Sequence, residues 1–304
     1  MRVVIPAGTS FRAAADSLAS AKVVGSPTLF RVYASARGQD RAIKPGTYEL
    51  RRGSSWNRVL ETLTSGSALL GSVTIPEGYD LRQITPALAR ALNVPADSVD
   101  AAVRDTALLR RLGIPTPTVE GYLFPETYAF TPGTTARAAV GQMVALFERR
   151  WRPEWNAQLQ ALAMSRHDAI TLASIVEKEA RRADERPVIA AVYHNRLKRR
   201  MPLQADPTVQ YARGSHTARV LYKDLEIDSP YNTYRRAGLP PGPIASPGSP
   251  SIAAALFPAQ VPYLYFVAAP DGHHEFRTTF EEHTRARNEL RRAAAAAAQP
   301  ARER

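Results

Sequence analysis

Two glutamates stand two residues apart in the apolar stretch 172–180, "LASIVEKEA". On a helix advancing about 100° per residue, Ile175 and Val176 belong to one apolar face. Glu179 falls inside that face, whereas Glu177 lies near its edge. The pattern therefore predicts that Glu179 is the buried carboxyl of the pair.

A carboxylic acid that is buried without a partner cation has a raised pKa, because burial disfavours its charged form. Such a group can keep its proton near neutral pH and act as a general acid. Two alternatives remain open at this point. Glu179 could instead pair with Arg182 or Arg186 at the helix boundary, and Glu177 could be the reactive member.

The sequence offers little for other chemistries. The chain has no cysteine, which excludes disulfides, thiolate metal sites and cysteine nucleophiles. Its histidines lack zinc-site spacing, and no G-x-x-x-x-G-K-[ST] phosphate loop occurs. His273 and His274 follow a glycine turn, where solvated histidines are expected. We therefore expect no metal and no cofactor.

The elements that must position the glutamates can be read from caps and periodicity. A helix is predicted over 168–182 with Asp168 as its N-cap. Further helices are expected at about 135–150 and 187–200, and another starts near Asp206 after a polar loop. An apolar strand over 263–268, a turn at 271–272 and a return strand predict a hairpin, followed by a terminal helix.

An internal repeat occupies the N-terminal part. "VIPAGTSFRAAADSLASAKVV" from Val4 and "TIPEGYDLRQITPALARALNV" from Thr74 align without a gap at an offset of 70 residues. Each copy predicts a short strand, a Pro-x-Gly turn, a cap at Ser10 or Asp80, and an amphipathic helix. These strand–helix units, at about 3–25 and 73–95, resemble LysM-type glycan-binding modules. A purely structural α+β subdomain is the alternative.

The net charge of the chain limits the classes of partner that it could bind. The formal net charge of +12 suits an acidic partner such as nucleic acid, anionic lipid or an anionic wall polymer. Compositional bias and solubility would explain it equally well. The arginines are scattered instead of forming a stripe interleaved with aromatic residues, which disfavours nucleic acid. No run approaches 18 apolar residues, so we expect no membrane span in this sequence.

Eight blocks in the C-terminal two-thirds carry a resemblance to a known family. They are "EGYLFPETY", "ASIVEKEA", "NRL", "LQADPTVQY", "YNTY", "GLPPGPIASPG", "PYLYFVA" and the His-x-Phe of His274 and Phe276. In this order they resemble the endolytic murein transglycosylases (MltG, YceG-like). The resemblance implies an α+β fold in which a LysM-like glycan- or partner-binding region (1–114) precedes a mixed α+β catalytic domain (115–292). The closing segment, 293–304, is expected from its own sequence to be a disordered tail.

The resemblance also implies the reaction and its residues. Glu179 would be the single catalytic acid and base of a lyase that cleaves the MurNAc–GlcNAc bond and leaves 1,6-anhydro-MurNAc ends. The residues expected to bind the sugar are Gln204, Asp206, Thr208, Tyr231, Asn232 and Tyr234, with Glu177 and Glu120 as supporting groups. Asp206 could instead cap a helix, Asn232 could fix a turn, and Glu120 could form a salt bridge at a strand end.

Peptidoglycan glycan strands, nascent ones included, are the partner that the family implies, with cell-wall synthases as further partners and no nucleic acid. The expected location is the outer face of the bacterial inner membrane, with membrane attachment only through an anchor missing from this chain. Two other functions compete with the enzyme: a non-catalytic LysM-like scaffold that binds peptidoglycan, and nucleic-acid binding through the positive charge.

Overall fold

The computed structural model describes residues 1–304 except 7, 66–70, 132, 216–219 and 299–304. The chain folds into two compact units that interleave along the sequence. The first comprises 1–74, 85–102 and 127–142, and the second comprises 75–84, 103–126 and 143–304. The predicted functional division at residue 114 stays a prediction.

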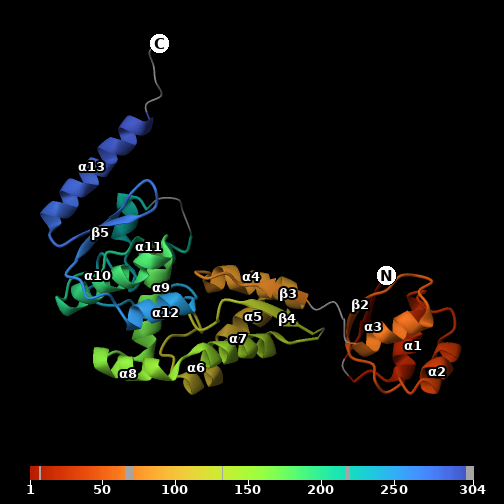
Figure 1. Cartoon of the computed structure of the whole chain (residues 1–304). Coiled ribbons are helices and arrows are strands. Elements are labelled where there is room, and N and C mark those ends of the chain that lie inside the picture. The colour runs from red at the N-terminus through yellow and green to blue at the C-terminus, as the bar shows by residue number, and fades with distance from the viewer. Residues whose placement is uncertain (7, 66–70, 132, 216–219, 299–304) are drawn as a thin grey trace, which may run out of the picture. The chain divides into compact units, whose positions relative to one another are not determined.

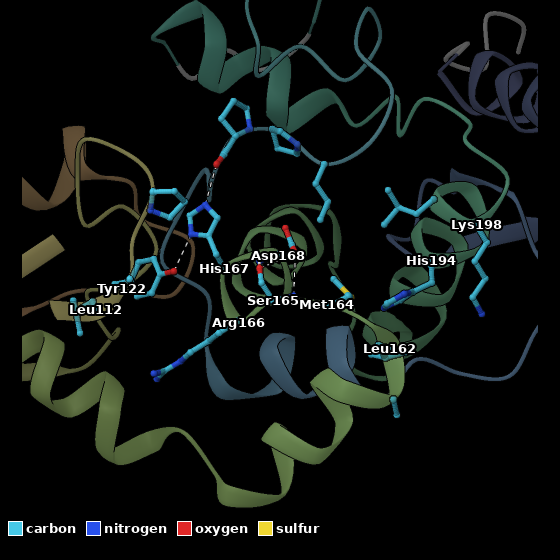
Figure 2. A pocket seen from close by; sticks show the side chains of 17 residues that line it. Leu112, Tyr122, Leu162, Met164, Ser165, Arg166, His167, Asp168, His194 and Lys198 are labelled. Atoms are coloured by element: carbon cyan, nitrogen blue, oxygen red, sulfur yellow. Dashed lines mark hydrogen bonds between the residues drawn. The ribbon is translucent and has the colours of Figure 1, made fainter. Parts of the chain in front are cut away.

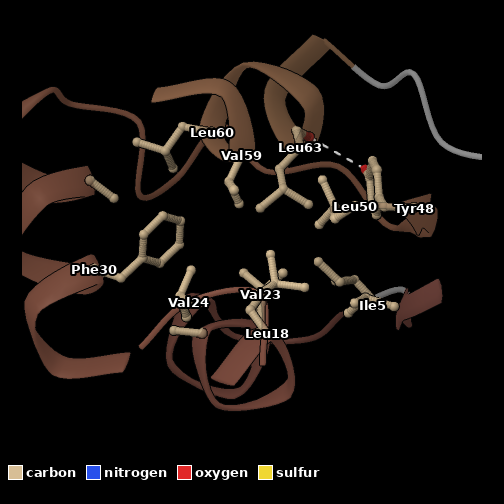
Figure 3. Packing of buried hydrophobic residues seen from close by; sticks show 14 residues of the cluster. Ile5, Leu18, Val23, Val24, Phe30, Tyr48, Leu50, Val59, Leu60 and Leu63 are labelled. Atoms are coloured by element: carbon tan, nitrogen blue, oxygen red, sulfur yellow. Dashed lines mark hydrogen bonds between the residues drawn. The ribbon is translucent and has the colours of Figure 1, made fainter. Parts of the chain in front are cut away.

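The N-terminal part of the first unit folds around its own hydrophobic core. It consists of β1 (Arg2–Ile5), α1 (Phe11–Ser20), α2 (Pro27–Ala36), β2 (Gly46–Glu49) and α3 (Trp56–Ser65), with β1 and β2 antiparallel (Figure 1). Leu18, Phe30 and Leu60 are fully buried in the core (Figure 3). The hydroxyl of Tyr48 donates to the carbonyl of Leu63 at 3.3 Å, which joins β2 to α3.

The second copy of the repeat adopts the predicted strand and helix. β3 (Gly71–Thr74) pairs antiparallel with β4 (Thr127–Phe130), and α4 (Leu81–Leu92) follows the turn after β3. The two predicted caps are also present: the Ser10 side chain accepts from the amide of Ala13, and that of Asp80 from the amide of Gln83. α5 (Ala96–Val103), α6 (Thr106–Leu112) and α7 (Ala136–Arg150) complete this stretch of the chain.

Helices dominate the second unit. They are α8 (Pro153–Leu162), α9 (Arg166–Glu179), α10 (Arg186–Lys198), α11 (Asp206–Arg213), α12 (Ser249–Leu256) and α13 (Phe280–Ala298), with short 3-10 turns η1 (Ala183–Glu185) and η2 (Tyr222–Glu226). α9 packs against α12 and α10 (Figure 1). All side chains from Ala169 to Val176 are buried, so α9 is enclosed on every side along its middle.

The start of α9 differs from the prediction. Its N-cap is Ser165, whose side-chain oxygen accepts from the amide of Asp168 at 3.0 Å. The Asp168 carboxylate accepts in turn from the Ser165 amide, also at 3.0 Å. Asp168 is therefore the third helical residue of a capping box, and its prediction as the N-cap is wrong. Both residue types cap helices, and three positions separate them.

The C-terminal end forms the predicted hairpin. β5 (Tyr265–Ala268) pairs antiparallel with β6 (His274–Arg277), and α13 follows. α13 continues to Ala298, so the first part of the segment predicted as a disordered tail is helical, and residues 299–304 lie outside the described residues. The predicted α+β class is confirmed. Among the described residues, no helix combines the length and apolarity needed to cross a membrane.

Candidate active site

Glu179 is the last residue of α9, and its side chain lines a cavity of about 270 Å³ in the second unit. Its Oε1 atom accepts a hydrogen bond from the hydroxyl of Tyr193 on α10 at 3.1 Å. Tyr193 is itself buried, because α10 packs against α9. Glu179 keeps partial exposure. A carboxyl at the end of a buried helix is therefore presented to a space that a ligand can enter.

The surroundings of Glu179 favour its protonated form. Burial is the main cause and raises its pKa from the ordinary 4.5 to about 7. The hydrogen bond from Tyr193 and the charge of Arg181 act in the opposite direction, while the charge of Asp206 adds to the rise. At neutral pH a substantial fraction of the molecules therefore carries a proton at this position.

Glu177 is held differently although it is also largely buried, with a side chain 7% exposed. Its Oε1 lies 3.6 Å from Nη2 of Arg186, and its Oε2 accepts from the amide of Gly248 at 3.0 Å. It does not line the Glu179 cavity. Burial alone thus fails to separate the two glutamates, contrary to the helix-face argument. A cationic partner and a position away from the cavity separate Glu177 from Glu179.

Three of the predicted sugar-binding residues line the cavity with Glu179: Gln204, Asp206 and Tyr234. The Tyr234 hydroxyl donates to Oδ1 of Asp206 at 2.6 Å. Gln204 has a left-handed backbone with φ of 53°, and its Oε1 accepts from Nη1 of Arg196 at 3.2 Å. Asp206 is the first residue of α11, and the N-cap, Ala205, makes no side-chain capping bond. The capping interpretation of Asp206 is therefore wrong.

The other three predicted sugar-binding residues do not line this cavity. Thr208 is fully buried, and its hydroxyl donates to the carbonyl of Ala205 at 2.7 Å. Asn232 is also fully buried: its amide nitrogen donates to the carbonyls of residues 225 and 227, and its oxygen accepts from the amide of Tyr234. The Tyr231 ring packs near the Tyr211 ring. Asn232 thus shapes the loop that carries Tyr234, as the alternative interpretation held.

Glu120 is buried elsewhere in the same unit. Its Oε2 accepts from the amide of Leu81 at 3.0 Å and from the hydroxyl of Tyr211 at 3.3 Å. Burial raises its pKa to about 8, with the Leu81 hydrogen bond opposing the rise. Glu120 ties the start of α4 to α11 and does not line the Glu179 cavity. Its position and partners thus fit neither of the two predicted roles, a supporting group beside Glu179 or a salt bridge at a strand end.

Sequence reasoning did not assign several residues that line the cavity. They are Tyr193, Arg196, Leu203, Phe266, Ala268, His274 and His283. The glycine turn predicts a solvated His274, but this residue is 7% exposed, so that prediction is wrong. Its bond to Glu185 spans 89 positions of the chain, so no local pattern could have found it. The neighbouring His273 is more exposed and pairs with Asp271.

A larger cavity of about 960 Å³ lies elsewhere in the second unit, near the start of α9 (Figure 2). His167 occupies its wall. Because the carbonyl of Pro241 can only accept, Nε2 of His167 donates to it at 2.9 Å, and Nδ1 accepts from Tyr122 at 2.9 Å. Asp168, the carboxylate on this wall, is engaged in the α9 capping box. Among the described residues, this cavity therefore lacks a free acid.

The residues that the structure describes contain no cluster of side chains suited to bind a metal ion. No group of three or more histidine, cysteine, aspartate or glutamate side chains there could hold a metal ion. What the Glu179 cavity offers is a carboxyl with a pKa near neutrality, surrounded by hydroxyl, amide and aromatic groups. That combination suits proton transfer to a sugar.

Comparisons with known proteins agree with one another. Residues 3–289 match the YceG-like family. The chain is 37% identical over 302 residues to the endolytic murein transglycosylase of Bacillus subtilis (strain 168), covering 94% of this chain and 84% of that protein. It is 30% identical over 315 residues to the endolytic murein transglycosylase of Streptococcus pneumoniae serotype 2 (strain D39), covering 93% of this chain and 57% of that protein.

A solved structure is also similar. The crystal structure of a YceG-like protein from Listeria monocytogenes superposes with a TM-score of 0.68 and is 34% identical in sequence. The match covers 94% of this chain and 98% of that one. Fold and sequence therefore point to the same relatives.

Proposed function

The chain belongs to the YceG-like family, and from that membership and the Glu179 cavity we propose that it cleaves peptidoglycan glycan strands. It is an endolytic murein transglycosylase, a lyase, like the relatives from Bacillus subtilis and Streptococcus pneumoniae that carry this name. The single observation that carries the mechanism is the Glu179 carboxyl, whose pKa is raised to about 7 beside an open cavity.

In the first step, protonated Glu179 donates its proton to the glycosidic oxygen between MurNAc and GlcNAc. The bond from the anomeric carbon to that oxygen breaks, and positive charge of oxocarbenium type develops on the muramyl ring. A pKa close to the working pH suits this task, because the group is protonated often enough and still acidic enough to give the proton up.

In the second step, the Glu179 carboxylate accepts the proton of the muramyl 6-hydroxyl as that oxygen bonds to the anomeric carbon. The product carries a 1,6-anhydro-MurNAc end, Glu179 regains its proton, and no water is consumed. One carboxyl therefore suffices, whereas glycoside hydrolases of the usual kind need two. Tyr193, which donates to Glu179, stabilises the carboxylate formed between the steps.

Other residues of the cavity wall supply sugar contacts in this proposal. The Asp206–Tyr234 pair offers a carboxylate and a flat ring, and Gln204 offers an amide held by Arg196. Such mixed polar and aromatic walls are typical of carbohydrate sites. Thr208, Tyr231 and Asn232 support the loops that carry these groups.

We further propose that residues 1–114 hold glycan or a partner protein, cell-wall synthases being the partners expected, and that the enzyme works outside the cytoplasm, where its substrate lies. The positive net charge of +12 suits an acidic wall polymer. The competing scaffold function, in which the chain binds peptidoglycan without cleaving it, is disfavoured because the relatives bear the name of an enzyme.

Exchanging Glu179 for glutamine tests the proposal. Glu179→Gln removes the transferable proton and keeps the size of the side chain, so anhydro-MurNAc ends from purified glycan strands should vanish in mass spectrometry while strand binding persists. Glu177→Gln is the matched control, expected to keep the anhydro product. Activity that survives the change at 179 and is lost with the change at 177 would reverse the assignment.

A further inference from the structure

His274 is anchored by two hydrogen bonds to one carboxylate. Its backbone amide donates to Oε1 of Glu185 at 2.8 Å, and its ring nitrogen Nδ1 lies 2.7 Å from Oε2. Glu185 ends η1, the short turn between α9 and α10, so the chain that leaves Glu179 supplies the anchor. Both side chains are largely buried, at 4% and 10% exposure.

The anchor determines which ring nitrogen stays available. A carboxylate oxygen accepts, so the hydrogen between the two groups lies on Nδ1 of His274, and in the tautomer with its hydrogen on Nδ1 the other ring nitrogen, Nε2, has a lone pair. Among the described residues, no group forms a hydrogen bond with Nε2. Because His274 lines the same cavity as Glu179, its side chain belongs to the wall of the proposed substrate space.

Aromatic packing holds the His274 ring in place. The ring of Phe266 meets it edge-on, with centroids 5.3 Å apart. Phe266 also packs edge-on against Tyr193, at 5.9 Å, and Tyr193 donates to Glu179. The acid and the histidine are thus positioned by one packed set of side chains. A group fixed in advance loses little conformational entropy when a ligand binds it.

We propose that Nε2 of His274 accepts a hydrogen bond from a hydroxyl or acetamido N–H of the glycan and thereby orients the sugar against Glu179, with Glu185 as the positioning residue behind it. The proposal rests on the function proposed above. It adds a substrate contact from the β5–β6 hairpin to the contacts proposed for Gln204, Asp206 and Tyr234.

His274→Asn separates the two roles of the ring. Asparagine supplies an N–H near the position of Nδ1, which preserves the bond to Glu185, but it has nothing in place of Nε2. On glycan strands released from purified peptidoglycan, kcat/KM for anhydro-end formation should fall about tenfold or more. The matched change His273→Asn, at the half-buried neighbour outside the cavity lining, should leave kcat/KM unaltered. Equal rates for both variants would overturn the proposal.

Glu185→Gln tests the positioning residue. Its kcat/KM should fall as well, and the double variant Glu185→Gln/His274→Asn should be no slower than His274→Asn alone, because Glu185 acts only by positioning His274. Losses that multiply in the double variant would show independent roles and reject the arrangement. If His274→Asn melts earlier than the wild type, glycan binding in the Glu179→Gln background decides: a weaker affinity supports the contact, and an unchanged affinity refutes it.

Failure of this proposal is distinguishable from failure of the proposed function. If Glu179→Gln abolishes anhydro ends but His274→Asn is fully active, the lyase stands without the histidine contact. If anhydro ends persist in Glu179→Gln, the assigned acid is wrong whatever the histidine does.

Discussion

At the scale of the residue, two glutamates of similar burial differ in what compensates their charge. Glu177 has Arg186 and a backbone amide, which suit an anion. Glu179 has a neutral donor, Tyr193, and a pKa raised to about 7. An uncompensated buried carboxyl is a candidate acid, whereas a compensated one is structural.

The raised pKa of Glu179 predicts the pH dependence of cleavage. Since the reaction needs the protonated form, kcat/KM should fall about tenfold per pH unit above a pH near 7. Tyr193→Phe removes a bond that lowers this pKa, so the falling limb should move to higher pH. Measured pH profiles test this, with Tyr211→Phe, outside the cavity, as the control that leaves the limb in place. A falling limb that moves to lower pH in Tyr193→Phe would contradict the assignment of this limb to Glu179.

Glu120 should make stability depend on pH. Its pKa is raised from 4.5 to about 8, so between these values the folded state binds more protons than the unfolded state, and stability falls as pH rises. Glu120→Gln removes that loss, which amounts to about 5 kcal/mol or less for the rise from 4.5 to about 8 at 1.36 kcal/mol per pKa unit. Urea unfolding at pH 5 and pH 9 should give a smaller stability difference for the variant than for the wild type. An equal difference in both proteins would show that Glu120 does not titrate in this range.

At the scale of the element, α9 carries the acid at its C-terminal end and a capping box at its N-terminal end. Its middle is buried all round and packs on α12 and α10. The helix is therefore held by packing over its length, and the cap determines where it begins. The two ends can be perturbed separately, because Glu179 makes its contacts with α10 and the cavity.

Ser165→Ala should lower the free energy of unfolding by about 1 kcal/mol, because the amide of Asp168 loses its acceptor. Ser165→Gly is the matched control and should cost only a few tenths of a kcal/mol, since glycine lets water reach the free amides. Denaturant titrations of the two variants measure the difference. Activity per folded molecule should not change in either. An alanine variant as stable as the wild type would show that the Ser165 cap contributes nothing.

At the scale of the whole molecule, the chain forms two compact units. The N-terminal core of Leu18, Phe30 and Leu60 is complete within the first unit, and the walls of the Glu179 cavity come entirely from the second. The N-terminal core thus lies within the proposed binding region, and the Glu179 cavity lies within the proposed catalytic region. A substitution that destabilises the N-terminal core should therefore not destabilise the helices around the Glu179 cavity.

Leu18→Ala tests that separation. Deleting a fully buried leucine side chain costs about 2–5 kcal/mol, so amide hydrogen exchange in α1 and α3 should accelerate. Exchange in α9 and α10, and cleavage of short soluble glycan fragments, should stay unchanged. The exposed Leu29, replaced by alanine, serves as the control with no effect on either region. Faster exchange in α9 as well would mean that the two units unfold together.

The sequence by itself determined the elements and the identity of the proposed acid. Caps, turns and periodicity predicted the strand–helix repeat, the helix of Glu179 and the terminal hairpin, because these signals act over a few neighbouring residues. The helix-face pattern is an incomplete basis for preferring Glu179 to Glu177, because the middle of α9 is buried on all sides. Motif order implied the family, and the comparisons confirmed it.

Only the tertiary structure decided which polar side chains meet at the cavity. Thr208 and Tyr234 come from equally promising sequence blocks, yet Thr208 is buried on α11 beside Thr233, whereas Tyr234 lines the cavity with Glu179. His274 was predicted to be a solvated turn residue, but it lines the cavity, where it is hydrogen-bonded to the carboxylate of Glu185, 89 positions away. The physical reason is that burial and partners depend on chain segments distant in sequence, about which local propensity carries no information.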